Sequence, residues 1–263
     1  GSRSWFGIGS LGIQPSEFMK LGMILFISKY LVKNNKNIKD IKKGVFPILL
    51  ILLLVFGLIM LQPDFGTGIV IVMISIALMF VGGVNFNFFI KIGILGVIGI
   101  VVLIILAPYR MERIVSYLNP WKDPLGSGFQ IIQSLYAIGP GGLFGLGLGN
   151  SIQKHFYLPE PQTDFIFSII SEELGFLGCL LIVILFLSII IFGIRIALKK
   201  EDLFGKYIVF GIIFWISFQA ILNLMVVVGL IPVTGVTLSF ISYGGSSLLV
   251  SMASIGVILN ISK

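Results

Sequence analysis

Long apolar runs recur along the whole chain and constrain its fold more than any other feature. Each run has about the 20 residues that an α-helix needs to cross roughly 30 Å of hydrocarbon. Hydrophobic residues make up 57% of the 263 residues and charged residues only 11%, which excludes an ordinary soluble domain. We therefore predict an all-α membrane protein, a polytopic helical bundle that forms a single domain over residues 1–263. The seven predicted spans are 16–32, 45–62, 67–83, 88–107, 176–194, 207–229 and 246–261.

The basic residues gather in two short loops between these spans. Six lysines lie between positions 29 and 43, and a second basic group lies between 195 and 206. Cytoplasmic loops carry an excess of Lys and Arg, so both loops are predicted to be cytoplasmic. The net charge of +7 then needs no nucleic-acid partner. The same assignment places the polar stretch 108–175 outside, as a large extracellular loop between the fourth and fifth spans.

Cysteine and histidine usage excludes two kinds of site. Cys179 and His155 are the only residues of their types, so an intrachain disulfide is impossible and a His/Cys zinc site is excluded. His155 is expected at the surface of the outer loop. The chain begins outside the membrane, and nothing at its start would carry that end across. We therefore expect further helices to precede it in the natural protein.

Two opposite charges lie near the outer end of the first span. Glu17 and Lys20 are i,i+3 neighbours on one face of the predicted helix, which Pro15 would start. Charges at that depth are costly unless they face each other or a wet interior. Two interpretations follow: a structural ion pair at the membrane edge, or the lining of a polar cavity that opens outward.

Proline and glycine break the outer loop into short pieces. Between the breaks, Phe129–Ile138 has the pattern of a short amphipathic helix lying at the membrane interface. The glycine-rich stretch Gly139–Asn150 lacks the preceding strand and the Lys-Ser/Thr ending of a phosphate-binding loop. Close backbone packing, or a hinge, is its expected use.

One carboxylate stands where this loop returns to the membrane. Asp164 follows Pro, Gln and Thr and precedes the Phe-Ile-Phe run that ends at Phe167. Its apolar neighbours are expected to raise its pKa toward the working pH, which suits a general base. Thr163-Asp164 is also a good N-terminal cap signal, so capping of the helix that follows is the alternative interpretation.

The segment 230–247 is rich in hydroxyls and glycine and carries no charge. Irregular backbone at the end of a span persists where it is buried in protein or lines a wet cavity. We expect a packed re-entrant segment, with a plain extracellular turn as the alternative. Ser242 and Ser246 are its candidate cavity residues. Convergence of this segment, Asp164 and the Glu17–Lys20 pair on one cavity is a hypothesis.

At these residues the chain resembles the SEDS family of shape, elongation, division and sporulation proteins, which includes RodA, FtsW and SpoVE. The matching blocks, in order, are Gln14-Pro-Ser-Glu17, Gln62-Pro-Asp-Phe-Gly-Thr67, Asn119-Pro-Trp, Asp123–Gln130, Gly145–Lys154, Tyr157–Phe167, Glu172-Glu-Leu-Gly175, Ile231–Gly235 and Ser242–Ser247. They cover essentially the whole chain. Gln162 stands where many members have His, and the sequence of the outer loop is most similar to that of the SpoVE/FtsW branch.

The resemblance implies a fold of ten transmembrane helices, of which this chain would hold the last seven. It implies a peptidoglycan glycosyltransferase that polymerises lipid II at the outer face of the bacterial cytoplasmic membrane, in cell division, cell shape or sporulation. It also implies a class B penicillin-binding protein as partner. The family's essential outer-loop Asp matches Asp164, and its cavity-lining Glu and Lys match Glu17 and Lys20.

The expected reaction joins the 4-hydroxyl of one sugar to the anomeric carbon of another, with Asp164 as base. The leaving pyrophosphate needs cations or a divalent ion such as Mg²⁺ or Mn²⁺, which Asp164 or Glu160 would hold. One of Glu172 and Glu173 is expected to face the cavity, and the other to neutralise nearby bases. The candidate substrate-binding residues are Glu17, Lys20, Arg110, Arg113, Lys122, Lys154, Glu160, Glu172, Ser242 and Ser246.

Two other functions suit the same pattern. A flippase for lipid II would also need a polar cavity within a helical bundle. It would need polar lining at both faces, however, whereas the unusual residues gather on the predicted outer side. The third possibility is a non-catalytic membrane scaffold for a penicillin-binding protein, in which changes at Glu17, Lys20 and Asp164 would spare activity.

Overall fold

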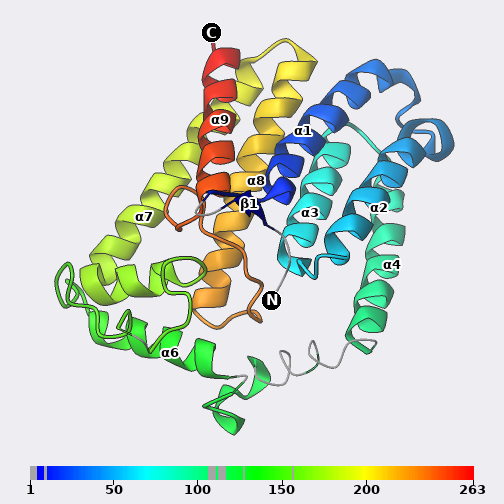
Figure 1. Ribbon diagram of the computed structural model, residues 1–263. Coiled ribbons are helices and arrows are strands. Elements are labelled where there is room, and N and C mark those ends of the chain that lie inside the picture. The colour runs from blue at the N-terminus through cyan, green and yellow to red at the C-terminus, as the bar shows by residue number, and fades with distance from the viewer. Residues whose placement is uncertain (1–4, 9–10, 106–110, 112–116, 127, 156) are drawn as a thin grey trace. The chain divides into compact units, whose positions relative to one another are not determined.

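The computed structural model describes residues 5–8, 11–105, 111, 117–126, 128–155 and 157–263. Within them the fold is all-α apart from one short hairpin, β1 (Phe6–Ile8) paired antiparallel with β2 (Leu11–Ile13), which the sequence did not predict. Figure 1 shows the helices. They are α1 (Pro15–Lys33), α2 (Phe46–Met60), α3 (Phe65–Val81), α4 (Phe86–Ile105), α6 (Phe129–Ile138), α7 (Ile166–Lys199), α8 (Leu203–Val227) and α9 (Gly245–Ile261).

Each predicted span coincides with one helix, which confirms the all-α fold class. Three helical segments are long and apolar enough to cross a membrane: Lys43–Met60, Ile166–Lys199 and Leu203–Val227. Three further apolar helices are shorter, at Phe65–Val81, Phe86–Gly99 and Gly245–Ile261. The amphipathic helix predicted at Phe129–Ile138 is α6, with the predicted bounds.

The chain divides into two compact units, and α7 and α8 contribute residues to both. Unit 1 comprises Gly1–Lys91, Ser188–Gln219 and Gly244–Lys263, and unit 2 comprises Ile92–Leu187 and Ala220–Tyr243. The organisation as one domain stays a prediction.

In unit 1, α1 packs against α3 and α9, and α3 also packs against α2. The contact surfaces are aliphatic and include fully buried Ile24, Ile71 and Leu78. A Cβ on Gly211 of α8 would press on Ile24 and Leu78, so a small residue here lets α8 approach α1 and α3 closely.

In unit 2, the glycine-rich stretch packs against a break in α7. Gly175 has φ 65°, which interrupts the helix and releases the backbone groups on either side. The freed groups pair with the loop: Leu146 N donates to Glu172 O at 2.9 Å, and Phe176 N donates to Gly142 O at 2.9 Å. Close backbone packing and a hinge were the two expected uses of these glycines, and the structure shows the close packing.

The break also explains the one large boundary difference. The fifth span was predicted to begin at 176, whereas α7 begins at Ile166 and continues past Gly175. Residues 166–175 were assigned to the polar loop because Glu172, Glu173 and Gly175 end it. They form helix, and the glycine-rich stretch completes the broken turn at Gly175. Between Leu230 and Gly244 the backbone is irregular and partly buried, as predicted, and α9 begins at Gly245.

Candidate functional site

Asp164 lies at the end of the turn-rich segment, two residues before α7 begins. Its side chain is half-buried, and the next residue, Phe165, is fully buried and anchors the segment. The backbone around Asp164 is held by hydrogen bonds at successive carbonyls. Tyr243 N donates to Gln162 O at 2.8 Å, and Ser242 Oγ donates to Thr163 O at 2.6 Å.

The third carbonyl in this row belongs to Asp164 itself. Asn223 of α8 donates from Nδ2 to Asp164 O at 2.8 Å and to Val236 O at 2.9 Å. A Cβ on Gly235 would lie 3.7 Å from Oδ2 of Asp164, so this carboxylate lies beside the 230–244 segment. The 230–244 segment therefore lies beside Asp164 within unit 2, and the cavity on which they were expected to converge stays a prediction.

The Glu17–Lys20 pair forms in unit 1. Lys20 Nζ lies 2.8 Å from Glu17 Oε1, and the two side chains are only 2% and 6% exposed. Gln219 Oε1 accepts from Lys20 Nζ at 2.9 Å and from Trp215 Nε1 at 2.7 Å. The Lys20 ammonium also lies 4.9 Å from the centroid of the Trp215 ring. Glu17 and Lys20 therefore form an ion pair, whereas the lining of a cavity by this pair and its convergence with Asp164 stay predictions.

Sequence reasoning missed both partners from α8. Trp215 and Gln219 stand at i,i+4 spacing within a largely apolar span, which places them on one face of a helix. An amide side chain in a membrane span needs an internal partner, and that requirement was the available signal.

Asp64 was also missed, although it belongs to a quoted motif. Its carboxylate caps α3 by accepting from Thr67 N at 3.1 Å, and it accepts from Gln14 Nε2 at 3.2 Å. Gln14 N in turn donates to Ser246 Oγ at 3.0 Å. Ser246 is thus buried and tied to the chain before α1, and its predicted contact with substrate stays a prediction.

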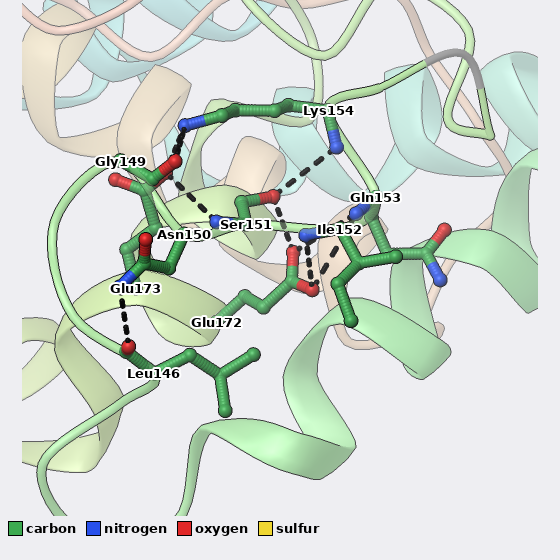
Figure 2. Close-up of polar contacts among 9 residues, drawn as sticks. All are labelled: Leu146, Gly149, Asn150, Ser151, Ile152, Gln153, Lys154, Glu172 and Glu173. Carbon is green, nitrogen blue, oxygen red and sulfur yellow. Dashed lines mark hydrogen bonds and ion pairs between the residues drawn. The ribbon is translucent and has the colours of Figure 1, made fainter.

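Glu172 holds the outer loop from inside α7, as Figure 2 shows. The residue Glu172 is 1% exposed. Its carboxylate accepts hydrogen bonds from Ser151 Oγ, from Ile152 N at 3.0 Å and from Gln153 N. These contacts turn Glu172 toward the loop's own backbone. A contact of Glu172 with substrate stays a prediction.

The neighbouring acid pairs with a base, as expected of one of the two glutamates. Lys154 Nζ lies 2.7 Å from Glu173 Oε1 and donates to Gly149 O at 2.7 Å (Figure 2). Lys154 was predicted to bind substrate phosphate, and in the structure its ammonium contacts Glu173 and Gly149 instead.

The remaining predicted ligands differ in exposure. Lys122 and Glu160 are exposed, and so is His155, as predicted. Thr163 fixes the Glu160 turn by donating from N and Oγ1 to Glu160 O. Arg110 and Arg113 lie outside the described residues. Among the residues that the structure describes, no group of three or more His, Cys, Asp or Glu side chains is placed to hold a metal ion.

The comparisons with known proteins all point to the same protein family. The family model described as cell cycle protein, for FtsW, RodA and SpoVE, matches residues 1–263. Stage V sporulation protein E of Bacillus subtilis is 58% identical over 263 residues, which are all of this chain and 72% of that protein. The probable peptidoglycan glycosyltransferase FtsW of Coxiella burnetii is 44% identical over 265 residues, covering 99% of this chain and 71% of that protein.

Solved structures give the same result. A chain of a peptidoglycan synthase complex, described as coordinating polymerization and crosslinking, aligns with a TM-score of 0.80 at 34% identity. That alignment covers all of this chain and 73% of the other. The rod shape determining protein RodA of Thermus thermophilus aligns with a TM-score of 0.68 at 30% identity, over all of this chain and 69% of that one.

Proposed function

Because the chain belongs to the FtsW, RodA and SpoVE family of cell cycle proteins, we infer that it is a peptidoglycan glycosyltransferase of the cell membrane. Its long apolar helices make it a multi-pass membrane protein. The reaction that we assign is polymerisation of lipid II, the undecaprenyl-pyrophosphate-linked disaccharide peptide, into glycan strands. The process is cell division, cell shape or sporulation. The active side faces outward, because the lysine-rich loops mark the opposite ends of the spans as cytoplasmic.

The fixed position of Asp164 is the observation that carries this proposal. Three successive carbonyls, those of Gln162, Thr163 and Asp164, accept hydrogen bonds from Tyr243, Ser242 and Asn223. The carboxylate is half-buried and lies beside Gly235, which has no side chain to cover it. A carboxylate held in this way is suited to general base catalysis, which contributes about 10²- to 10⁴-fold in rate.

The chemical step that we assign is a single displacement. The 4-hydroxyl oxygen of the acceptor sugar forms a bond to the anomeric carbon of the donor sugar. The bond between that carbon and the pyrophosphate oxygen breaks, and the leaving lipid pyrophosphate takes the electron pair. Asp164 receives the hydroxyl proton.

The negative charge of the leaving group requires positive charge nearby. Lys122 is exposed, whereas Lys154 would have to exchange Glu173 for a phosphate oxygen. Arg110, Arg113 and Lys20 are the other candidates from the sequence.

A divalent cation fits the same segment. Asp164 and Glu160 are the carboxylates that would hold Mg²⁺ or Mn²⁺, which neutralises leaving-group charge when bound. They lie four residues apart along the chain, and neither is buried. Mg²⁺ usually takes one or two carboxylates together with substrate phosphates and water, so two carboxylates suffice.

A class B penicillin-binding protein is the partner that we propose. The similar synthase complex is described as coordinating polymerization and crosslinking. A glycosyltransferase supplies only the polymerization, so a transpeptidase must supply the crosslinking.

Polymerisation in detergent separates this function from lipid II transport. The purified full-length protein, with the transpeptidase, is given lipid II in micelles, where no bilayer exists to be crossed. Glycan strands are expected on a gel of the labelled products. No polymer in micelles, together with movement of labelled lipid II across the bilayer of liposomes, would establish a flippase instead.

A further inference from the structure

Asn223 is a polar residue in the interior of an otherwise apolar part of α8. It is 1% exposed, and burial of an amide is costly unless its hydrogen bonds are replaced. Both hydrogens of its Nδ2 are used: one goes to Asp164 O at 2.8 Å and the other to Val236 O at 2.9 Å. Only a residue with two hydrogens on one nitrogen in a short side chain can join two carbonyls in this way.

The two carbonyls belong to segments far apart in the chain. Asp164 ends the turn-rich segment before α7, and Val236 lies in the 230–244 segment. Ser242 makes a second connection between these segments, because its Oγ accepts from Leu238 N at 2.7 Å and donates to Thr163 O at 2.6 Å. Peptide planes whose carbonyls are each held cannot rotate freely, so the direction in which the Asp164 side chain leaves the backbone is fixed.

The 230–244 segment itself needs such connections. Gly235 has φ +72° and Phe240 has φ +68°, in the left-handed region that an aromatic residue rarely adopts. Such conformations persist when the surrounding contacts determine them. The side-chain hydrogen bonds of Asn223 with Val236 O and of Ser242 with Leu238 N hold the backbone of this segment.

We propose that Asn223 is a positioning residue for the glycosyl transfer, and that it aims the Asp164 carboxylate by holding the Asp164 carbonyl to the 230–244 segment. Ser242 supports the same alignment one residue earlier. The inference rests on the proposed function, because it assumes that Asp164 is the base. Asn223 does not need to contact lipid II for this role.

The test compares Asn223→Asp with a variant that loses a buried hydrogen bond elsewhere in unit 2. Asn223→Asp keeps the size of the side chain but removes both donors. The matched control is Ser134→Ala, because Ser134 is 0% exposed and its Oγ bonds with Val227 O at 2.7 Å and Ser168 Oγ at 2.8 Å rather than with Asp164 or the 230–244 segment. Both variants are made in the full-length protein, and thermal unfolding in detergent is measured for each.

Steady-state polymerisation of lipid II supplies a readout that a loss of stability alone would not give. Misplacement of a catalytic group by about 1 Å costs on the order of 100-fold, so we expect kcat of Asn223→Asp to fall about 10- to 100-fold. Its KM for lipid II is expected to stay within about threefold of the unmodified value, because ground-state binding is retained. Ser134→Ala is expected to keep its kcat. An unchanged kcat in Asn223→Asp, or an equal loss in Ser134→Ala, would overturn the proposal.

Two further variants extend the test, and the first of them keeps it decisive if Asn223→Asp does not fold. Ser242→Ala removes the second connection and is expected to lower kcat with the same unchanged KM. The double variant Asp164→Asn/Asn223→Asp is expected to be no slower than Asp164→Asn alone, because a positioning residue acts only through its target. A Ser242→Ala variant of full kcat would contradict the proposal.

The outcomes for Asp164 and Asn223 are distinguishable. A fully active Asp164→Asn variant would overturn the assignment of the base and the positioning role with it. An inactive Asp164→Asn variant beside a fully active Asn223→Asp variant would overturn the positioning role alone.

Discussion

Lys20 Nζ and Glu17 Oε1 lie 2.8 Å apart in the interior of unit 1, with Gln219 and the Trp215 ring as the other partners of the ammonium. Neither charge can be removed alone without leaving the other buried. A buried pair of this kind contributes little net stability, but breaking it costs about 3–5 kcal/mol. The pair is therefore a sensitive probe of the interior of unit 1.

We expect Lys20→Met to lower the free energy of unfolding by about 3–5 kcal/mol, because the Glu17 carboxylate is left without its cation. The double variant Glu17→Gln/Lys20→Met is expected to recover part of that loss. Thermal unfolding of the purified variants in detergent measures both effects. A double variant less stable than Lys20→Met would contradict a direct coupling between the two side chains.

Glu172 should hold the outer loop, because its carboxylate accepts from Ser151 Oγ and from the backbone of Ile152 and Gln153. Hydrogen bonds to a charged group contribute about 1.5–3 kcal/mol each, so Glu172→Ala should expose these amides. Hydrogen exchange measured by mass spectrometry over 152–153 should become faster by at least tenfold.

Glu173→Gln is the matched control for that experiment. Its ion pair with Lys154 is partly exposed, and such pairs contribute about 1 kcal/mol or less. Glu173 accepts from Ser151 N at 3.3 Å, whereas the amides of Ile152 and Gln153 donate to Glu172, so exchange over 152–153 should change little in this variant. Equal exchange in Glu172→Ala and Glu173→Gln would show that the buried carboxylate is not what holds the loop.

Gly175→Ala should destabilise unit 2. The φ of 65° at this position strains any residue with a Cβ, and that Cβ would overlap the backbone of Leu143 and Gly145. We expect a loss of more than about 1 kcal/mol in the free energy of unfolding. Gly57→Ala in α2 is the control, because, outside its own turn of helix, no atom of the described residues lies within 4 Å of its added Cβ. That substitution should be neutral or stabilising by up to about 1 kcal/mol. If both variants are equally stable, the close packing at Gly175 has been misassigned.

The divalent cation that we propose at Asp164 or Glu160 would make polymerisation dependent on metal. Removal of metal with EDTA should abolish glycan synthesis, and added Mg²⁺ or Mn²⁺ should restore it. Thermal unfolding should not change, because neither carboxylate is part of the buried interior. Full activity in EDTA would leave the basic residues alone to neutralise the leaving group.

The helices were predictable because the hydrophobic pattern alone determines which segments can enter a bilayer. The ion pair of Glu17 with Lys20 was predictable too, because i,i+3 spacing brings two side chains together within one helix. The interaction of Lys20 with Gln219 joins residues 199 positions apart, and no local pattern encodes that distance.

The contacts of Asp164 could not be predicted from the sequence for the same reason. Its motif singles out a carboxylate at the end of a loop, but the backbone bonds that hold it come from Asn223 in α8 and from Ser242 in an irregular segment. Likewise, Glu172 is a plausible substrate ligand in the sequence. Only the folded loop reveals that its carboxylate binds the backbone of residues 152 and 153.

Asp164 is the residue on which the whole account depends. The decisive measurement is the kcat for lipid II polymerisation of the Asp164→Asn variant of the full-length protein, at matched folded concentration. An amide of the same shape cannot accept the hydroxyl proton, so the account predicts a loss of about 10²-fold or more. Glycan synthesis at the unmodified rate would contradict it.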